Sequence, residues 1–185
     1  MRILYAALLS LLFLVLPAGA GTLAGVTLPD KVEVKGRSLV LNGMGLRTKF
    51  FIKVYVGALY LAQKEKSPAK IMADDEPRRM VMHFLYSVSK DQMCDAWKEG
   101  LEQNTPKASA EVKKAFATLC SWMEPIPKGH ELVLTYVPGE GTMVEINGKG
   151  KGTLEGKAVS DAVVATWIGP DPAPGQDFKK AVLGE

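Results

Sequence analysis

The feature that most constrains the fold is one unbroken stretch of β-forming residues, LRTKFFIKVYVGALYL, at positions 46–61. Aromatic and β-branched side chains dominate this stretch, and such residues favour extended strands. Successive side chains of a strand point to opposite faces, and here both faces are largely apolar. A strand of this kind needs cover on both sides. The sequence therefore predicts a long central strand that carries Arg47, Lys53 and Tyr55 on one face.

The segments around this strand predict a single α+β domain. Shorter β-forming runs predict further strands at 26–34, 38–42, 78–86, 131–137, 142–146 and 151–154. Apolar residues at helical spacing and helix-starting residues predict helices at 69–73, 90–103, 108–122, 157–167 and 176–183. Gly43-Met44-Gly45 is interpreted as a flexible break before the central strand. Strands, then helices, then a meander indicate an antiparallel sheet, and no linker divides residues 21–185.

The first twenty residues have the pattern of a secretory signal peptide. Arg2 supplies a positive start, residues 3–16 are almost continuously apolar, and Ala18-Gly19-Ala20 is a small-residue cleavage site. The apolar run is shorter than the roughly 20 residues of a membrane-spanning helix. We therefore expect cleavage after Ala20, a periplasmic location and no membrane span in the mature chain. The alternative is an uncleaved N-terminal anchor.

Export changes the expectation for the two cysteines, Cys94 and Cys120. Disulfides persist in oxidising compartments, and these residues lie on two neighbouring predicted helices. We expect them to pair and to join the helices, whereas two buried free thiols are the alternative.

Charge and motifs exclude several other classes of function. The chain has 23 basic and 20 acidic side chains, mixed along its length, which argues against a nucleic-acid partner. It has two histidines and neither an HExxH nor a CxxC motif, so no metal site is predicted. It also lacks a GxSxG elbow and a phosphate-binding loop, so no cofactor is predicted.

Arg47 is the strongest candidate for chemistry. It begins a mainly apolar segment, where an unpaired buried charge would be very costly. Its planar guanidinium suits a carboxylate or an enolate oxygen. With Lys53 and Tyr55 at alternating positions it would suit an apolar ligand with an anionic head. The alternative is a structural salt bridge to one of the 20 acidic residues.

Residues 42–49 (NGMGLRTK) and 53–61 (KVYVGALYL) resemble the chalcone isomerase family, more narrowly its exported bacterial chalcone isomerase-like members. Residues 159–162 (VSDA) and 167–170 (WIGP) agree with this resemblance. It implies an open-faced β-sandwich, in which a large antiparallel sheet is covered by a helical layer. A pocket for a flat or elongated apolar molecule would lie between the two layers.

The resemblance also implies roles for individual residues. The family arginine, which stabilises an enolate or, in plastid members, holds a fatty-acid carboxylate, corresponds to Arg47. The family threonine falls on Tyr55, the tyrosine near Phe84 and the asparagine on Asp91, while a last hydroxyl is kept as Ser160. Phe84 has no hydroxyl and Asp91 carries a charge in place of an amide. These two departures argue against efficient chalcone cyclisation but not against binding.

Three functions follow from these residues. The first is a non-catalytic periplasmic protein that binds a small apolar acid, fatty or aromatic, through Arg47. The second is an isomerase, an intramolecular lyase in which Arg47 stabilises an enolate while Tyr55 or Ser160 orders a water. The third is an envelope protein that acts through its surface. The predicted ligand-binding residues are Arg47, Lys53, Tyr55, Phe84, Asp91 and Ser160.

Overall fold

The computed structural model describes residues 19–185. Its strands are β1 (Ala20–Leu23), β2 (Val26–Pro29), β3 (Lys31–Val34), β4 (Arg37–Lys49), β5 (Ile52–Leu61), β6 (Arg78–Phe84), β7 (Glu131–Val137), β8 (Gly141–Ile146) and β9 (Lys149–Leu154). Its helices are α1 (Pro68–Ala73), α2 (Lys90–Asn104), α3 (Ala110–Trp122), α4 (Lys157–Ile168) and α5 (Gln176–Val182). Apart from Gly19 and Ala20, the predicted signal peptide lies outside the described residues. No helix within 19–185 is long and apolar enough to cross a membrane.

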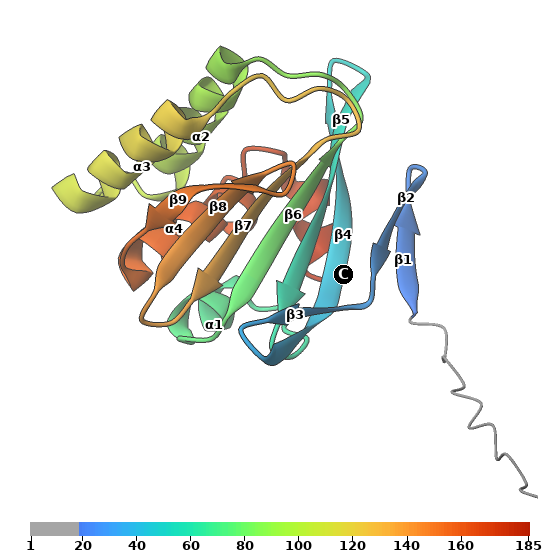
Figure 1. Ribbon diagram of the computed structural model, residues 1–185, viewed down its shortest axis with the longest axis horizontal. Helices are drawn as coiled ribbons and strands as arrows, with labels where there is room; N and C mark the ends of the chain where they lie inside the picture. Colours follow the sequence, from blue (N-terminus) through green and yellow to red (C-terminus); the bar gives the residue numbers. More distant parts are fainter. Residues whose placement is uncertain (1–18) are drawn as a thin grey trace, which may run out of the picture.

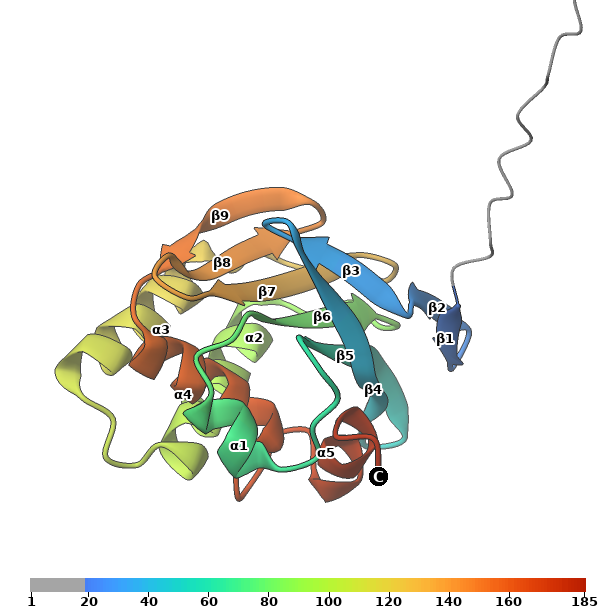
Figure 2. The same ribbon diagram turned by 90° about the horizontal axis from the view of Figure 1, so that it is seen from below.

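One antiparallel sheet organises the molecule. Its seven strands follow the chain in the order β3-β4-β5-β6-β7-β8-β9, and β1 and β2 form a separate hairpin. The sheet curls, and all five helices lie on one of its faces (Figures 1 and 2). An ion pair of 3.1 Å between Lys35 and Glu140 joins the β3–β4 turn to the β7–β8 loop across the curl. This is the predicted α+β sheet with a helical layer.

Each face of the sheet has its own apolar core. Leu59, Phe84 and Ile168 belong to the larger core, between the sheet and the helices. Val56 and Tyr60 point to the opposite face, where the β1–β2 hairpin and β3 cover them. The Tyr60 hydroxyl donates a hydrogen bond of 2.9 Å to the Pro29 carbonyl. Strand β5 is therefore covered on both sides, as its two apolar faces predicted.

The prediction of one long strand over residues 46–61 is wrong, because the chain reverses at Phe50-Phe51. Strand β4 ends at Lys49, and β5 begins at Ile52 and pairs back along it. Both turn residues have positive φ, 48° at Phe50 and 67° at Phe51. Two-residue hairpin turns of this kind normally use Asn, Asp or Gly. Phe-Phe is not a typical turn pair, so the β-forming pattern of residues 46–61 continues through the turn and predicted a single strand.

The interpretation of Gly43-Met44-Gly45 as a flexible break is also wrong, because these residues lie within β4. A Cβ atom added to Gly43 would be 2.1 Å from the Ala181 carbonyl oxygen, and one on Gly45 would be 2.8 Å from the Phe178 ring. The glycines therefore allow α5 to pack directly against the strand. The neighbouring Asn42 is buried and donates a hydrogen bond of 2.9 Å to the Val182 carbonyl, which fixes this contact.

A disulfide joins Cys94 on α2 to Cys120 on α3, with the two Cα atoms 5.1 Å apart. Helix α2 begins at a capping box, in which Ser89 and Gln92 each bond the other's backbone N–H. The disulfide and the cap together fix the helix that forms one wall of the main cavity.

Candidate functional site

The main cavity has a volume of about 400 Å³. It lies between the β4–β5 hairpin and β6 on one side and α2 and α4 on the other. Most of its lining is apolar and includes Phe50, Ile52, Val54, Met82, Phe84, Val88, Met93, Ala96, Trp97, Trp167 and Ala173. Its polar lining includes Arg47 and Tyr55. An apolar cavity with a few convergent polar groups is typical of a small-molecule site.

Arg47 and Tyr55 lie in the cavity as direct cross-strand partners of β4 and β5. The register shifts immediately beyond this pair, so that Thr48 faces Lys53 and Val54 has no partner on β4. Such a bulge places two successive residues on one strand opposite a single residue, and it redirects the side chains that follow. Val54 and Ile52 therefore line the cavity together with Tyr55, whereas Lys53 does not.

The guanidinium of Arg47 is half-buried and is not neutralised by the protein. Its Nη1 donates a hydrogen bond to the Ala173 carbonyl, in the loop between α4 and α5. Within residues 19–185, no carboxylate oxygen lies within 4.0 Å of its nitrogen atoms. Arg47 therefore forms no structural salt bridge in the described chain. Asp95 and Glu99 line the cavity from exposed positions on α2 without pairing with it.

Tyr55 supplies a neutral donor beside this charge. Its hydroxyl is buried and accepts a hydrogen bond of 3.2 Å from Trp167 Nε1. Burial raises the pKa of Tyr55 to about 12, although the positive charge of Arg47 and the hydrogen bond from Trp167 both act to lower it. The hydroxyl therefore keeps its proton at neutral pH. Since Trp167 uses an acceptor position of the oxygen, the O–H remains able to donate to a ligand.

Trp97 adds a second buried donor to the cavity wall. Its side chain is 4% exposed, and its Nε1 has no hydrogen-bond partner among the described residues. A buried N–H without an acceptor costs free energy, so such a group needs an explanation. Trp97 packs edge to face against Trp167, with the ring centroids 5.4 Å apart. Neither tryptophan was singled out from the sequence as a cavity residue.

The chain matches the family model described as chalcone isomerase-like over residues 20–184. It belongs to the chalcone isomerase-like family. Among solved structures, it is similar to a fatty-acid binding protein of Arabidopsis thaliana, with a TM-score of 0.70 and 16% sequence identity. That match covers 89% of this chain and 96% of the other. The likeness confirms the predicted fold. A comparison with curated protein sequences finds no match.

Three of the residues that the family resemblance implied lie at this cavity. Arg47 and Tyr55 form the polar pair, and Phe84 is the partner of Tyr55 on β6, with the two ring centroids 5.6 Å apart. Phe84 contributes an apolar surface without a hydroxyl. Tyr86, two residues further along, lines the cavity but is 51% exposed. With Phe84 in place of the family tyrosine, the β6 wall of the cavity in this chalcone isomerase-like protein lacks a hydroxyl and is more apolar.

Lys53 and Asp91, also predicted as ligand-binding residues, do not line this cavity. The bulge at Val54 removes Lys53 from the lining, as described above. Asp91 occupies the first turn of α2 and is exposed. A carboxylate in that turn interacts favourably with the helix dipole, which accounts for its position without a ligand.

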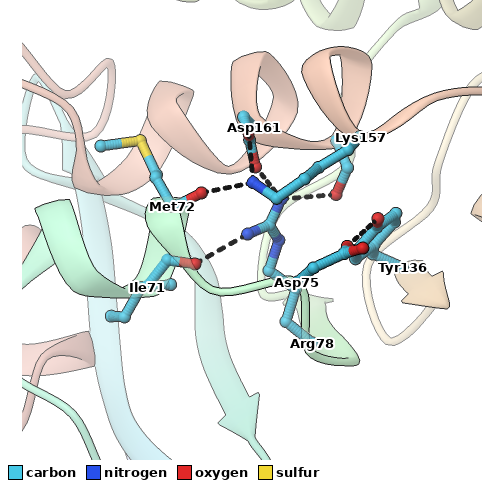
Figure 3. Close-up of polar contacts among 8 residues, drawn as sticks. Ile71, Met72, Asp75, Arg78, Tyr136, Lys157 and Asp161 are labelled. Atoms are coloured by element: carbon cyan, nitrogen blue, oxygen red, sulfur yellow. Dashed lines mark hydrogen bonds and ion pairs between the residues drawn. The ribbon is translucent and has the colours of Figure 1, made fainter. Parts of the chain in front are cut away.

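Ser160 also lies outside the cavity, beside a buried arginine that sequence reasoning did not single out. The Ser160 hydroxyl accepts a hydrogen bond of 2.8 Å from Arg78 Nη2, and the same nitrogen contacts Asp161 Oδ1 at 2.5 Å. Nη1 of Arg78 donates to the Ile71 carbonyl at 2.9 Å (Figure 3). Ser160 therefore supports the packing of α4 on the sheet and cannot order a water beside Arg47.

Lys157 and Tyr136 complete this polar network. Lys157 Nζ lies 2.7 Å from Asp161 Oδ2 and donates to the Met72 carbonyl at the end of α1. The Tyr136 hydroxyl donates to Asp75 (Figure 3). Burial, together with this hydrogen bond and the charge of Asp75, raises the pKa of Tyr136 to about 12. The network joins α1, α4 and the sheet, and its role is structural.

Proposed function

We propose that this chalcone isomerase-like protein binds a small apolar acid and does not transform it. The observation that carries the proposal is the half-buried guanidinium of Arg47, which faces a mainly apolar cavity and has no carboxylate oxygen of residues 19–185 within 4.0 Å. A ligand carboxylate would supply the missing charge and accept hydrogen bonds from Arg47 and the neutral Tyr55 hydroxyl. The hydrocarbon part of the ligand would then lie against the Met, Phe and Trp side chains.

The size of the cavity supports a small ligand. Ligand pockets span about 300–1,000 Å³, and about 400 Å³ lies near the lower end of this range. The similar Arabidopsis protein is named for binding fatty acids, which supports an acid with an aliphatic chain. We therefore propose a fatty acid of medium length or an aromatic acid of similar volume.

Catalysis of the chalcone cyclisation has less support from the same residues. The donors Arg47 and Tyr55 could stabilise an enolate, but Phe84 has no hydroxyl and neither Asp91 nor Ser160 reaches the cavity. A cyclase also needs groups that fold its substrate into a reactive geometry. Of the polar residues that the family resemblance implied, only Arg47 and Tyr55 line the cavity and could serve this task.

We further propose that the protein works in the periplasm, after residues 1–20 are removed. The signal-peptide pattern supports export, and the Cys94–Cys120 disulfide supports an oxidising compartment. Native mass spectrometry of the chain recovered from a bacterial periplasmic fraction tests location and ligand together. It would give the N-terminus from the mass of the chain and the ligand from the mass of a bound acid.

Replacing Arg47 with Ala is expected to weaken the binding of decanoate about 10- to 100-fold, because a charge-assisted hydrogen bond contributes about 1.5–3 kcal/mol. Decanol, which has no carboxylate, should bind both proteins equally. Trp97 and Trp167 line the cavity, so tryptophan fluorescence would report binding. Lys53→Ala is the matched control, since Lys53 is exposed on the same hairpin and should leave the affinity unchanged. Equal loss in both variants, or no preference for decanoate, would contradict the proposal.

The affinity for decanoate is expected to stay constant between about pH 7 and pH 10. The guanidinium remains charged in this range, and Tyr55 remains protonated because its pKa is raised to about 12. Binding should weaken only below about pH 5, as the ligand carboxylate itself takes up a proton. Fluorescence titrations at a series of pH values would measure this profile. A transition near pH 6.5 would instead indicate that a histidine holds the anion.

A further inference from the structure

We propose that the β4–β5 turn docks this protein on a lipid bilayer with anionic headgroups, by inserting Phe50 and Phe51 into the membrane interface. The two side chains are 83% and 102% exposed, and the adjacent Ile52 is 42% exposed. Figure 1 shows this turn at the top of the view, beyond the end of β6. Isolated exposed apolar residues are common on proteins, but three in succession at a projecting tip mark an interaction site.

The backbone of the turn shows that these phenylalanines are not there for the turn itself. Three other two-residue turns of the described chain also have positive φ at both positions: Ala24-Gly25, Lys35-Gly36 and Asn147-Gly148. Each has glycine at the second position, where φ > 0 carries no steric cost. Phe51 occupies that position with a φ of 67°. A bulky residue there strains the backbone, and strain of this kind concentrates at functional sites.

Basic residues flank the phenylalanines. Lys49 and Lys53 lie within two residues of the turn, on β4 and β5, and both are exposed. Neither forms an ion pair within residues 19–185. Aromatic side chains beside lysines are typical of membrane-interface segments, and each lysine near an anionic leaflet strengthens binding. The carboxylates of Asp95 and Glu99 lie on α2, on the opposite wall of the cavity.

The area of the tip favours a bilayer over a protein partner. A stable protein interface buries about 800 Å² on each partner. Two phenylalanine side chains can bury only about 300–500 Å². A bilayer does not require a wide complementary surface, because it accepts the aromatic side chains individually while the lysines remain at the headgroups. The two phenylalanines therefore offer enough apolar area to anchor the turn in a membrane but too little to form a stable protein interface.

The position of the tip links docking to the cavity. Lys49, Phe50 and Ile52 line the cavity as well as forming the tip, and the exposed Tyr86 lies beside them. A docked molecule would therefore place the opening of the cavity against the bilayer, where an apolar acid could enter without crossing water. This consequence rests on the proposed ligand-binding function, whereas docking itself does not.

Co-sedimentation with vesicles of equal parts phosphatidylglycerol and phosphatidylcholine tests the proposal on the exported chain. The unmodified chain should sediment with these vesicles and should be released by high salt. Phe51→Gly should weaken vesicle binding at least about tenfold, and Phe50→Asn/Phe51→Gly about 100-fold. Both variants should melt at a higher temperature than the unmodified chain, because glycine adopts the positive φ of position 51 without strain, and the double variant also has the Asn-Gly pair that suits this turn. Loss of vesicle binding with a gain in stability is a result that misfolding cannot produce.

Phe51 does not line the cavity, so Phe51→Gly should bind decanoate in solution like the unmodified chain. Failure of docking and failure of ligand binding are therefore measured separately. Phe51→Trp should retain vesicle binding. Equal sedimentation of the unmodified chain and the double variant would overturn the proposal. So would an unmodified chain that ignores vesicles but self-associates in a manner that Phe51→Gly abolishes.

Discussion

Replacing Asp161 with Ala is expected to lower the free energy of unfolding by about 3 kcal/mol. Arg78 is 4% exposed, and Asp161 is the only carboxylate within ion-pair distance of it among the described residues. Removing one partner of a buried ion pair typically costs about 3–5 kcal/mol, because the other charge stays buried without compensation. The side chain of Asp161 is 28% exposed, so water can enter the space that it leaves and partly solvate Arg78. The loss of stability should therefore lie near the lower end of this range. Urea denaturation at neutral pH would measure it.

A neighbouring ion pair provides the matched control. Arg79 and Glu145 lie 3.8 Å apart, and their side chains are 25% and 35% exposed. Glu145→Ala should cost less than about 1 kcal/mol, as partly solvated pairs generally do. The double variant Arg78→Leu/Asp161→Leu should be more stable than Asp161→Ala, since it leaves no unpaired charge at the buried position 78, and Lys157, which also loses Asp161, is 32% exposed. If Asp161→Ala cost no more than the Glu145 variant, the network around Arg78 would not hold α4 to the sheet.

Much of the fold could be predicted from the sequence, because most elements are bounded by local signals. Ser89 is a helix-capping residue directly before α2, Asn147-Gly148 is a tight-turn pair between β8 and β9, and residues 131–137 were predicted as a strand with the bounds that the structure has. Each of these signals acts through a few neighbouring residues. The hairpin at Phe50-Phe51 was missed for the opposite reason, since its residues have no preference for a turn.

The candidate site could be predicted only in part. Arg47 and Tyr55 were expected on one face, and the structure makes them cross-strand partners. Lys53 was expected beside them but does not line the cavity, because a single-residue shift in register sends a side chain to the other face of a strand. That shift depends on pairing with a second strand, which the local pattern does not contain.

The remaining differences depend on contacts between distant parts of the chain. Gly43 and Gly45 looked flexible because the helix that packs on them, α5, lies more than a hundred residues away in sequence. Ser160 was predicted as a site residue from the family resemblance, whereas its hydroxyl accepts a hydrogen bond from Arg78, which begins a strand without any local sign of burial. The conformation of these glycines and the partner of Ser160 depend on tertiary packing, which overrides local sequence preference in such cases.

Removing the Cys94–Cys120 disulfide is expected to lower the free energy of unfolding by about 3 kcal/mol. The cysteines are 26 residues apart, and closing a loop of this length restricts the unfolded chain by about that amount in the chain-entropy model. For a domain of this size the melting temperature should fall by roughly 6–12 °C. Calorimetry of the Cys94→Ser/Cys120→Ser variant would measure the loss. Dithiothreitol should lower the melting temperature of the unmodified chain and leave that of the variant unchanged.

The same variant should weaken decanoate binding, although neither cysteine lines the cavity. Met93 and Trp97 flank Cys94 on α2 and form part of the cavity wall. Without the disulfide, α2 is held by its cap and its packing alone and should be more mobile. Ligand binding would then have to order this wall, and the entropy lost in doing so would weaken the affinity. Hydrogen exchange should therefore rise in α2 and α3 before it rises in β5 and β6. Uniform exchange across helices and strands would mean that the disulfide stabilises the whole domain and not the cavity wall in particular.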